Sequence, residues 1–151
     1  MKIVLLILAL LCNDQLLAGD LNSTQPHPSL SPKDVVQIVM NALKNNDHPN
    51  KNSGIAITFK FASPANKINT GPLERFNSIL KSQTFRPMIN HHSTTYEKYN
   101  LIGNRANIDV ILISSVGKIF GYRFFLSQQN GNKFEGCWMT DAVIPIKVIT
   151  L

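Results

Sequence analysis

Hydrophobic and polar positions change their spacing about halfway along the chain. Before residue 91, apolar residues recur every three or four positions in two segments, and after it they alternate with polar residues in four segments. The first spacing is typical of one face of a helix, and the second of a strand with one buried face. The pattern therefore predicts helices first and a run of strands afterwards, which is an α+β fold.

Two helices carry clear start signals. The first follows Ser31, a residue that caps helices well, with Pro32 at its first position; it is expected to end within residues 45–49. The second opens near Pro72, in the sequence Thr-Gly-Pro. Its apolar stripe consists of Leu73, Phe76, Ile79 and Leu80.

Four strands are predicted at residues 93–102, 107–115, 119–128 and 134–144, separated by short segments that contain glycine. Strands joined by short turns pair antiparallel, and Asn130-Gly131 is a strong hairpin signal. In the third strand, alternate residues from Phe120 to Leu126 share one face, and Ile119, Arg123 and Phe125 share the other. Both faces are partly apolar, so we expect helices on one face and a cavity or an interface on the other.

Residues 54–63 fit two patterns. Ile55, Ile57, Phe59 and Phe61 alternate as in a strand, whereas Ile55, Phe59 and Ala62 also share one face of a helix. Alternation alone favours the strand.

The N-terminus has the features of a cleavable signal peptide over residues 1–19. Lys2 is followed by an unbroken apolar run over residues 3–12, and the small residues Ala18 and Gly19 suit the cleavage site. A spanning helix needs about 20 apolar residues, so no stable membrane anchor is expected. Two alternatives stay open: a lipoprotein processed at Cys12, and a buried helix over residues 1–17.

The rest of the chain divides into a flexible, proline-containing tail over residues 20–30 and a single α+β domain over residues 31–151. The protein is expected to be secreted or periplasmic. Cleavage would leave Cys137 as the only cysteine, either buried or paired between chains, and no internal disulfide. The net charge is +6, but the basic residues are spread singly, so no nucleic-acid partner is expected.

Three blocks of sequence carry a resemblance to a known family. They are residues 61–67 (FASPANK), 70–76 (TGPLERF) and 134–139 (FEGCWM). They resemble a domain of unknown function found in bacteria, plants and algae, whose fold is thought to be the nuclear-transport-factor-like cone of helices on a curved sheet. The resemblance implies that residues 54–63 are helical, which we adopt, and it implies no activity and no catalytic residues.

The candidate chemistry is sparse. His91 and His92 would point to opposite faces of a strand, and no metal site or cofactor is expected. Asp109 and Asp141 lie on apolar faces of strands, where a carboxylate can act as a general base with a raised pKa. Such a carboxylate could equally hydrogen-bond a strand edge or pair with Arg123 or Arg105. Candidate ligand-binding residues are Tyr96, Tyr122, Arg123 and Trp138.

Three functions stay open on these observations. The leading one is non-enzymatic binding of a small apolar ligand or a protein partner. The second is a small acid–base enzyme of the isomerase, dehydratase or hydrolase type, with Asp109 or Asp141 as its base. The third is a secreted homodimer that associates through the open face of its sheet.

Overall fold

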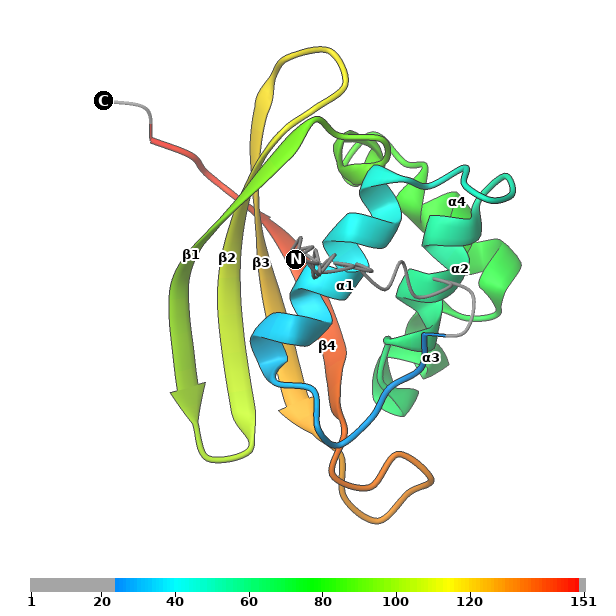
Figure 1. Cartoon of the computed structure of the whole chain (residues 1–151), viewed down its shortest axis with the longest axis vertical. Helices are drawn as coiled ribbons and strands as arrows, with labels where there is room; N and C mark the ends of the chain where they lie inside the picture. The colour runs from blue at the N-terminus through cyan, green and yellow to red at the C-terminus, as the bar shows by residue number, and fades with distance from the viewer. Residues whose placement is uncertain (1–23, 150–151) are drawn as a thin grey trace, which may run out of the picture.

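The computed structural model describes residues 24–149, and these form a helical layer packed against one antiparallel sheet (Figure 1). The helices come first in the chain and the strands afterwards, which confirms the α+β prediction. The helices are α1 (Pro32–Lys44), α2 (Ser53–Lys60), α3 (Pro64–Thr70) and α4 (Leu73–Leu80), followed by a 3-10 turn, η2 (Arg86–Met88). The strands are β1 (Ser93–Ile102), β2 (Arg105–Ile113), β3 (Ile119–Gln128) and β4 (Trp138–Ile146).

Helix α1 begins and ends where the sequence predicts. The Asp34 N–H donates to Ser31 Oγ at 3.2 Å, and the Ser31 N–H donates back to the Asp34 carboxylate at 2.8 Å. This reciprocal cap satisfies amide groups that the first turn leaves without partners. Val35, Val39 and Leu43 on its inner face are fully buried, so α1 lies at the centre of the core, between the sheet and the other helices (Figure 1).

Residues 54–63 are mostly helical, as the family resemblance implies and against the alternation of apolar residues. Helix α2 packs so closely on α1 that a Cβ on Gly54 would lie 2.1 Å from the carbonyl oxygen of Ala42. Asn46, just after α1, accepts hydrogen bonds from the N–H groups of Gly54 and Ile55. Helix α2 contacts both α1 and α4, and Ile55 and Ile57 are both buried, so apolar residues occur at alternating positions in a helix.

The four strands pair in the order β1-β2-β3-β4, all antiparallel. β1 and β3 have the predicted bounds, whereas β2 starts and ends two residues early and β4 starts at Trp138. The Asn130-Gly131 pair does not make a two-residue hairpin. Instead Glu135 turns back to accept from the Gly131 N–H at 2.6 Å, and residues 129–137 form a longer loop.

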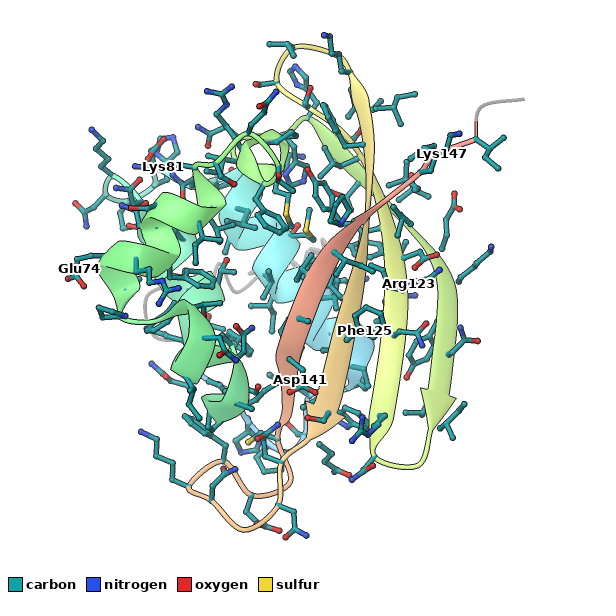
Figure 2. The ribbon with its side chains drawn as sticks, turned by 180° about the vertical axis from the view of Figure 1, so that it is seen from behind. Glu74, Lys81, Arg123, Phe125, Asp141 and Lys147 are labelled. Carbon is teal, nitrogen blue, oxygen red and sulfur yellow. The ribbon has the colours of Figure 1, made fainter. Side chains whose placement is uncertain are left out.

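The two faces of the sheet are unequal. Tyr122, Phe124 and Leu126 of β3 are buried under the helices, and Phe120 is half-buried. The opposite face carries Arg123 and Phe125 (Figure 2). Gly121 on that face leaves room for a small apolar cluster, because a Cβ there would lie within 3.2 Å of side-chain atoms of Ile111, Ile146 and Val148.

The predicted signal peptide, residues 1–19, lies outside the described residues, as does the start of the tail. Residues 24–30 form neither helix nor strand, and Leu30 packs against the core. Within residues 24–149, no helix has the length and hydropathy required to cross a membrane.

Candidate functional site

A cavity of about 440 Å³ lies between β4 and the helices. Its inner wall is apolar and comes from α1, α4, the segment that follows α4, and β3. This wall is formed by Val39, Leu43, Phe76, Ile79, Leu80, Phe85, Met88 and Phe124. The cavity is on the helix-covered side of the sheet, and the sequence pattern suggested the other side.

The end of the cavity between α3 and β4 is polar and opens to solvent. Asn66, Asn69 and Thr70 line it from α3, and Thr140 and Asp141 from β4. Ala65 and Ala142 line the same end and are exposed, so they lie at its mouth. The cavity therefore has an apolar interior and a polar entrance.

The chain before α3 fixes one side of this entrance to β4. Ala62 pairs with Thr140 in an isolated parallel bridge. The Ser63 N–H donates to the Thr140 carbonyl at 2.8 Å, and the Thr140 N–H donates to the Phe61 carbonyl at 2.8 Å. The Ser63 hydroxyl then caps α3 by accepting from the Asn66 N–H. The ammonium group of Lys67 also lies over the ring of Phe134, 5.5 Å from its centroid, so two of the sequence blocks noted above, residues 61–67 and 134–139, are in contact.

A bulge in β4 places Asp141 at the entrance. Phe125 of β3 is paired with Ala142, and the next residue, Leu126, is paired with Thr140, so Asp141 has no partner on β3. Bulges redirect side chains in this way and occur often at functional sites. Asp141 is half-buried and lines the cavity, as the general-base hypothesis requires for this residue.

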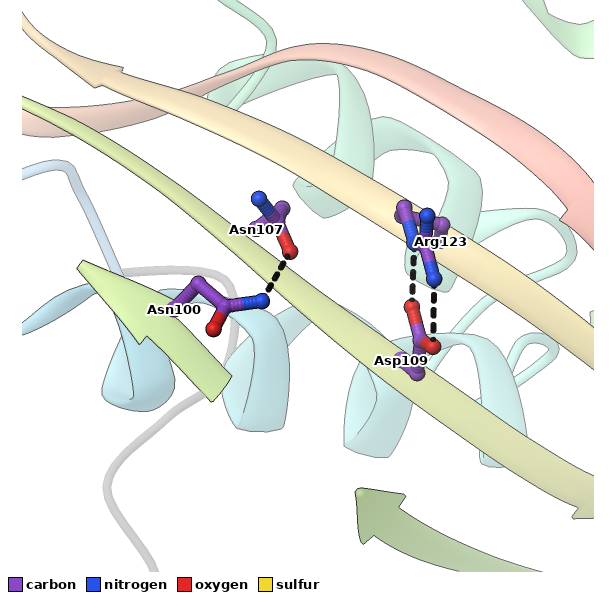
Figure 3. A network of polar contacts seen from close by, with 4 residues as sticks. All are labelled: Asn100, Asn107, Asp109 and Arg123. Carbon is purple, nitrogen blue, oxygen red and sulfur yellow. Dashed lines mark hydrogen bonds and ion pairs between the residues drawn. The ribbon is translucent and has the colours of Figure 1, made fainter. Parts of the chain in front are cut away.

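Asp109, the other candidate base, lies elsewhere. It is on the sheet face turned away from the helices, where Arg123 donates to its carboxylate from Nε at 2.6 Å and from Nη2 at 2.8 Å (Figure 3). These hydrogen bonds from Arg123 hold the pKa of Asp109 below its usual value. The raised pKa expected for a base is therefore wrong for Asp109, and the alternative pairing with an arginine is confirmed.

None of the four candidate ligand-binding residues is among those that line the cavity. Tyr122 is buried, and its hydroxyl donates to the Thr84 carbonyl at 2.7 Å; burial raises its pKa to about 12. Tyr96 packs against the core, and burial raises its pKa also. Trp138 is a core residue, and Arg123 is held by Asp109.

His91 is buried and fully hydrogen-bonded, whereas His92 is exposed. Nδ1 of His91 lies 2.8 Å from the Met88 carbonyl, which only accepts, so Nδ1 carries the proton. Nε2 then accepts from the Thr94 hydroxyl at 2.6 Å. Burial lowers the pKa of His91 and favours this neutral form. Across residues 24–149, no group of three or more His, Cys, Asp and Glu residues is placed to hold a metal ion.

Cys137 is a buried free thiol, and burial raises its pKa. Sequence reasoning did not single out α3 as part of a site. The available signal was the Ser63-Pro64 pair, which repeats the Ser31-Pro32 start of α1, followed by Asn66, Asn69 and Thr70 at helical spacing.

No family model, curated protein or solved structure matches this chain. The family resemblance and the cone-shaped fold that it implies stay predictions.

Proposed function

We propose that this protein is an exported binding protein that holds a small apolar ligand in the cavity between β4 and the helices. The observation that carries the proposal is the cavity itself. Folded proteins contain few internal spaces larger than a water molecule. A volume of about 440 Å³ falls within the range of roughly 300–1,000 Å³ that is typical of ligand pockets.

The lining favours an apolar molecule over water. Val39, Phe76, Phe85 and Phe124 offer no hydrogen bonds to water from their side chains, and water in a cavity needs about two to four polar partners. Apolar side chains that face an empty space lose dispersion contacts. A ligand that fills the space restores those contacts and so stabilises the folded protein.

The experiment blocks the mouth of the cavity. Ala65 is exposed on α3, so Ala65→Trp adds a large ring at the entrance without disturbing buried packing. Ser78→Trp is the matched control, because Ser78 is exposed on α4 and does not line the cavity. Binding is measured by the fluorescence of the neutral dye N-phenyl-1-naphthylamine, with circular dichroism to verify folding.

We expect the wild type and Ser78→Trp to bind the dye equally, and Ala65→Trp to bind it at least about tenfold more weakly, a change of about 1.4 kcal/mol. Absence of binding by the wild type, or equal binding by all three, would contradict the proposal. Native mass spectrometry of protein from its own host's secretions would show both export and a retained ligand.

The second candidate function is acid–base catalysis by Asp141, the one of the two proposed bases that lines the cavity. A carboxylate at the polar end of an apolar pocket can accept a proton from a bound substrate. Asp141→Asn separates the two functions. If the protein only binds its ligand, neither the wild type nor Asp141→Asn changes the bound compound chemically. If Asp141 is a catalytic base, the wild type converts the compound and Asp141→Asn does not.

Association of two copies through the outer face of the sheet is a separate proposal about partners. Ile113, Ile119 and Ile144 on that face are 40–49% exposed. An exposed apolar patch is a common feature of interaction surfaces. Sedimentation of the wild type against Ile119→Asp tests it: a wild-type monomer at high concentration would contradict the homodimer.

A further inference from the structure

We infer that the ligand is a hydrophobic amine, bound with its protonated amino group between α3 and β4 and its apolar part inside the domain. This inference rests on the proposed function and adds the chemical class of the ligand. It follows from three properties of the polar end of the cavity: which donors are already used, which acceptors are free, and which charges are present.

The hydroxyl donors at this end are largely used within the protein. The Thr70 hydroxyl donates to the main-chain carbonyl of Asn66 at 3.0 Å and to its side-chain oxygen at 2.9 Å. The Thr58 hydroxyl donates to the Gly54 carbonyl at 2.8 Å. One N–H of the Asn66 amide donates to the Thr140 carbonyl at 3.1 Å. The Thr140 hydroxyl and one N–H each of Asn66 and Asn69 remain for a ligand that only accepts, and all of these donors are neutral.

Acceptors, in contrast, are free. Within residues 24–149, the Asp141 carboxylate has no hydrogen bond and no ion pair, and the side-chain oxygen of Asn69 accepts no hydrogen bond. The hydroxyl oxygen of Thr140 is buried and has no hydrogen-bond partner, in a residue that is 6% exposed. All three residues line the cavity. A buried polar atom without a partner destabilises the protein, and a ligand that hydrogen-bonds the Thr140 hydroxyl removes that cost. The Asp141 carboxylate, in contrast, can only accept, so it requires a donor on the ligand.

The charge at this end has one sign. Asp141 is the only charged residue among those that line the cavity, and none of them is Lys, Arg or His. An ammonium group is a donor in every direction and forms strong hydrogen bonds with a carboxylate. A fatty-acid carboxylate would instead face Asp141 with like charge and would find only neutral donors on the lining.

The net charge of +6 acts in the opposite direction, but it is spread over the whole chain. Lys67, the cation next to Asn66 on α3, does not line the cavity; its Nζ donates to the Lys60 carbonyl at 3.3 Å and lies over the rings of Phe59 and Phe134. Asp141 therefore supplies the only charge on the lining itself, and that charge favours a cationic head group.

The size of the cavity sets the length of the ligand. At the roughly 30 Å³ that one water molecule occupies in the liquid, 440 Å³ holds about 15 non-hydrogen atoms. A ten-carbon chain with one polar group is therefore a suitable probe.

The test compares three probes that share this chain and differ in the head group: decylamine, 1-decanol and decanoate. Their affinities are measured by isothermal titration calorimetry, below the concentrations at which they form micelles, for the wild type, Asp141→Asn and Glu97→Gln. Glu97 is exposed on β1 and does not line the cavity, so Glu97→Gln makes the same change in charge away from the site.

We expect the wild type to bind decylamine about tenfold more tightly than 1-decanol, and decanoate most weakly. Asp141→Asn should abolish the preference for the amine and leave the affinity for 1-decanol unchanged, which also shows that the variant is folded. Glu97→Gln should behave as the wild type. Added salt should weaken the binding of decylamine and not that of 1-decanol.

Two results would overturn the inference and leave the proposed function intact: equal affinities for all three probes, or a preference for decanoate. A preference for the amine that persists in Asp141→Asn would overturn the role of this carboxylate. Failure of all three probes to bind the wild type would instead contradict the proposed function, together with the inference.

Discussion

The side-chain amide of Asn66 donates to the main-chain carbonyl of Thr140 at 3.1 Å and so joins α3 to β4 across 74 positions of the chain. The same carbonyl accepts from the Ser63 N–H. The Asn66 side-chain oxygen accepts from the Thr70 hydroxyl. Asn66 therefore holds the two sides of the cavity entrance together.

Replacement of Asn66 with alanine should lower the free energy of unfolding by about 1–2 kcal/mol, because it removes two hydrogen bonds at a half-buried position. It should also weaken dye binding, since α3 loses a contact with β4. Asn69→Ala is the control, as Asn69 is exposed on the same helix and makes only a 3.4 Å bond to Ala65. Urea unfolding measures both variants, and equal losses would contradict this role for Asn66.

The Asp109–Arg123 pair should make stability depend on acid pH. Its hydrogen bonds lower the pKa of Asp109 below 3.8 in the folded protein, so the stabilisation is present above that value and is lost as the pH falls through the folded pKa. Arg123→Met should therefore be less stable than the wild type at pH 7. The difference should shrink below about pH 4. Urea unfolding at several pH values measures it, and a difference that does not change with pH would refute the prediction.

His91 should make the protein less stable as the pH falls from neutral. Burial lowers its pKa from 6.5, so the unfolded chain binds a proton more readily than the folded protein does. The stability is fully present above pH 6.5, where both states are neutral, and it declines as the pH falls from 6.5 toward the lower pKa of the folded state. The thermal midpoint of His91→Gln should vary less across this range than that of the wild type.

The adjacent His92→Gln serves as the control for this prediction, because His92 is exposed. It should keep the wild-type dependence on pH. If His91→Gln and His92→Gln flatten the profile equally, burial of His91 is not the cause.

Gly54→Ala should destabilise the fold by about 1–3 kcal/mol or more, because the added Cβ would overlap backbone atoms of Ala42 that cannot move independently of α1. Gly131→Ala is a useful comparison. It has no atom within 4 Å of the new Cβ, and its cost arises only from a φ of 75°. Chemical denaturation should rank Gly54→Ala as clearly the more harmful, and the reverse order would contradict the close packing of α2 on α1.

Much of the fold follows from local sequence. The Ser31-Pro32 start, the apolar stripes of α1 and α4, and the alternation in β1 and β3 are properties of short segments, and the structure has those elements where they were expected. Residues 54–63 show the limit of such reasoning. Their alternation arises because α2 is buried by tertiary contacts, among them the close approach of Gly54 to α1, and a local pattern does not contain that information.

The site is less predictable for the same reason. Asp141 was singled out as a polar residue on an apolar strand, and it lines the cavity. Its position depends on a bulge opposite Phe125 and Leu126, which is a property of the paired strands. Asn66 and Thr140 are 74 positions apart in the chain and come into contact only when it folds. The cavity likewise depends on the spacing between the helical layer and β4. The sequence offered an arginine as an alternative partner for Asp109, but only the register of β2 against β3 decides that this arginine is Arg123.

The short parallel bridge between Ala62 and Thr140 also has a consequence for how the protein behaves at high concentration. An unpaired strand edge is a template for aggregation, and this segment covers part of the outer edge of β4. The opposite edge, β1, is interrupted by an irregular register between Glu97 and Tyr99 that leaves Lys98 without a partner on β2. A charged residue in a bulge is one of the features that discourage a new strand from adding to an edge. The contacts that build the cavity entrance thus also help to keep separate molecules from joining their sheets.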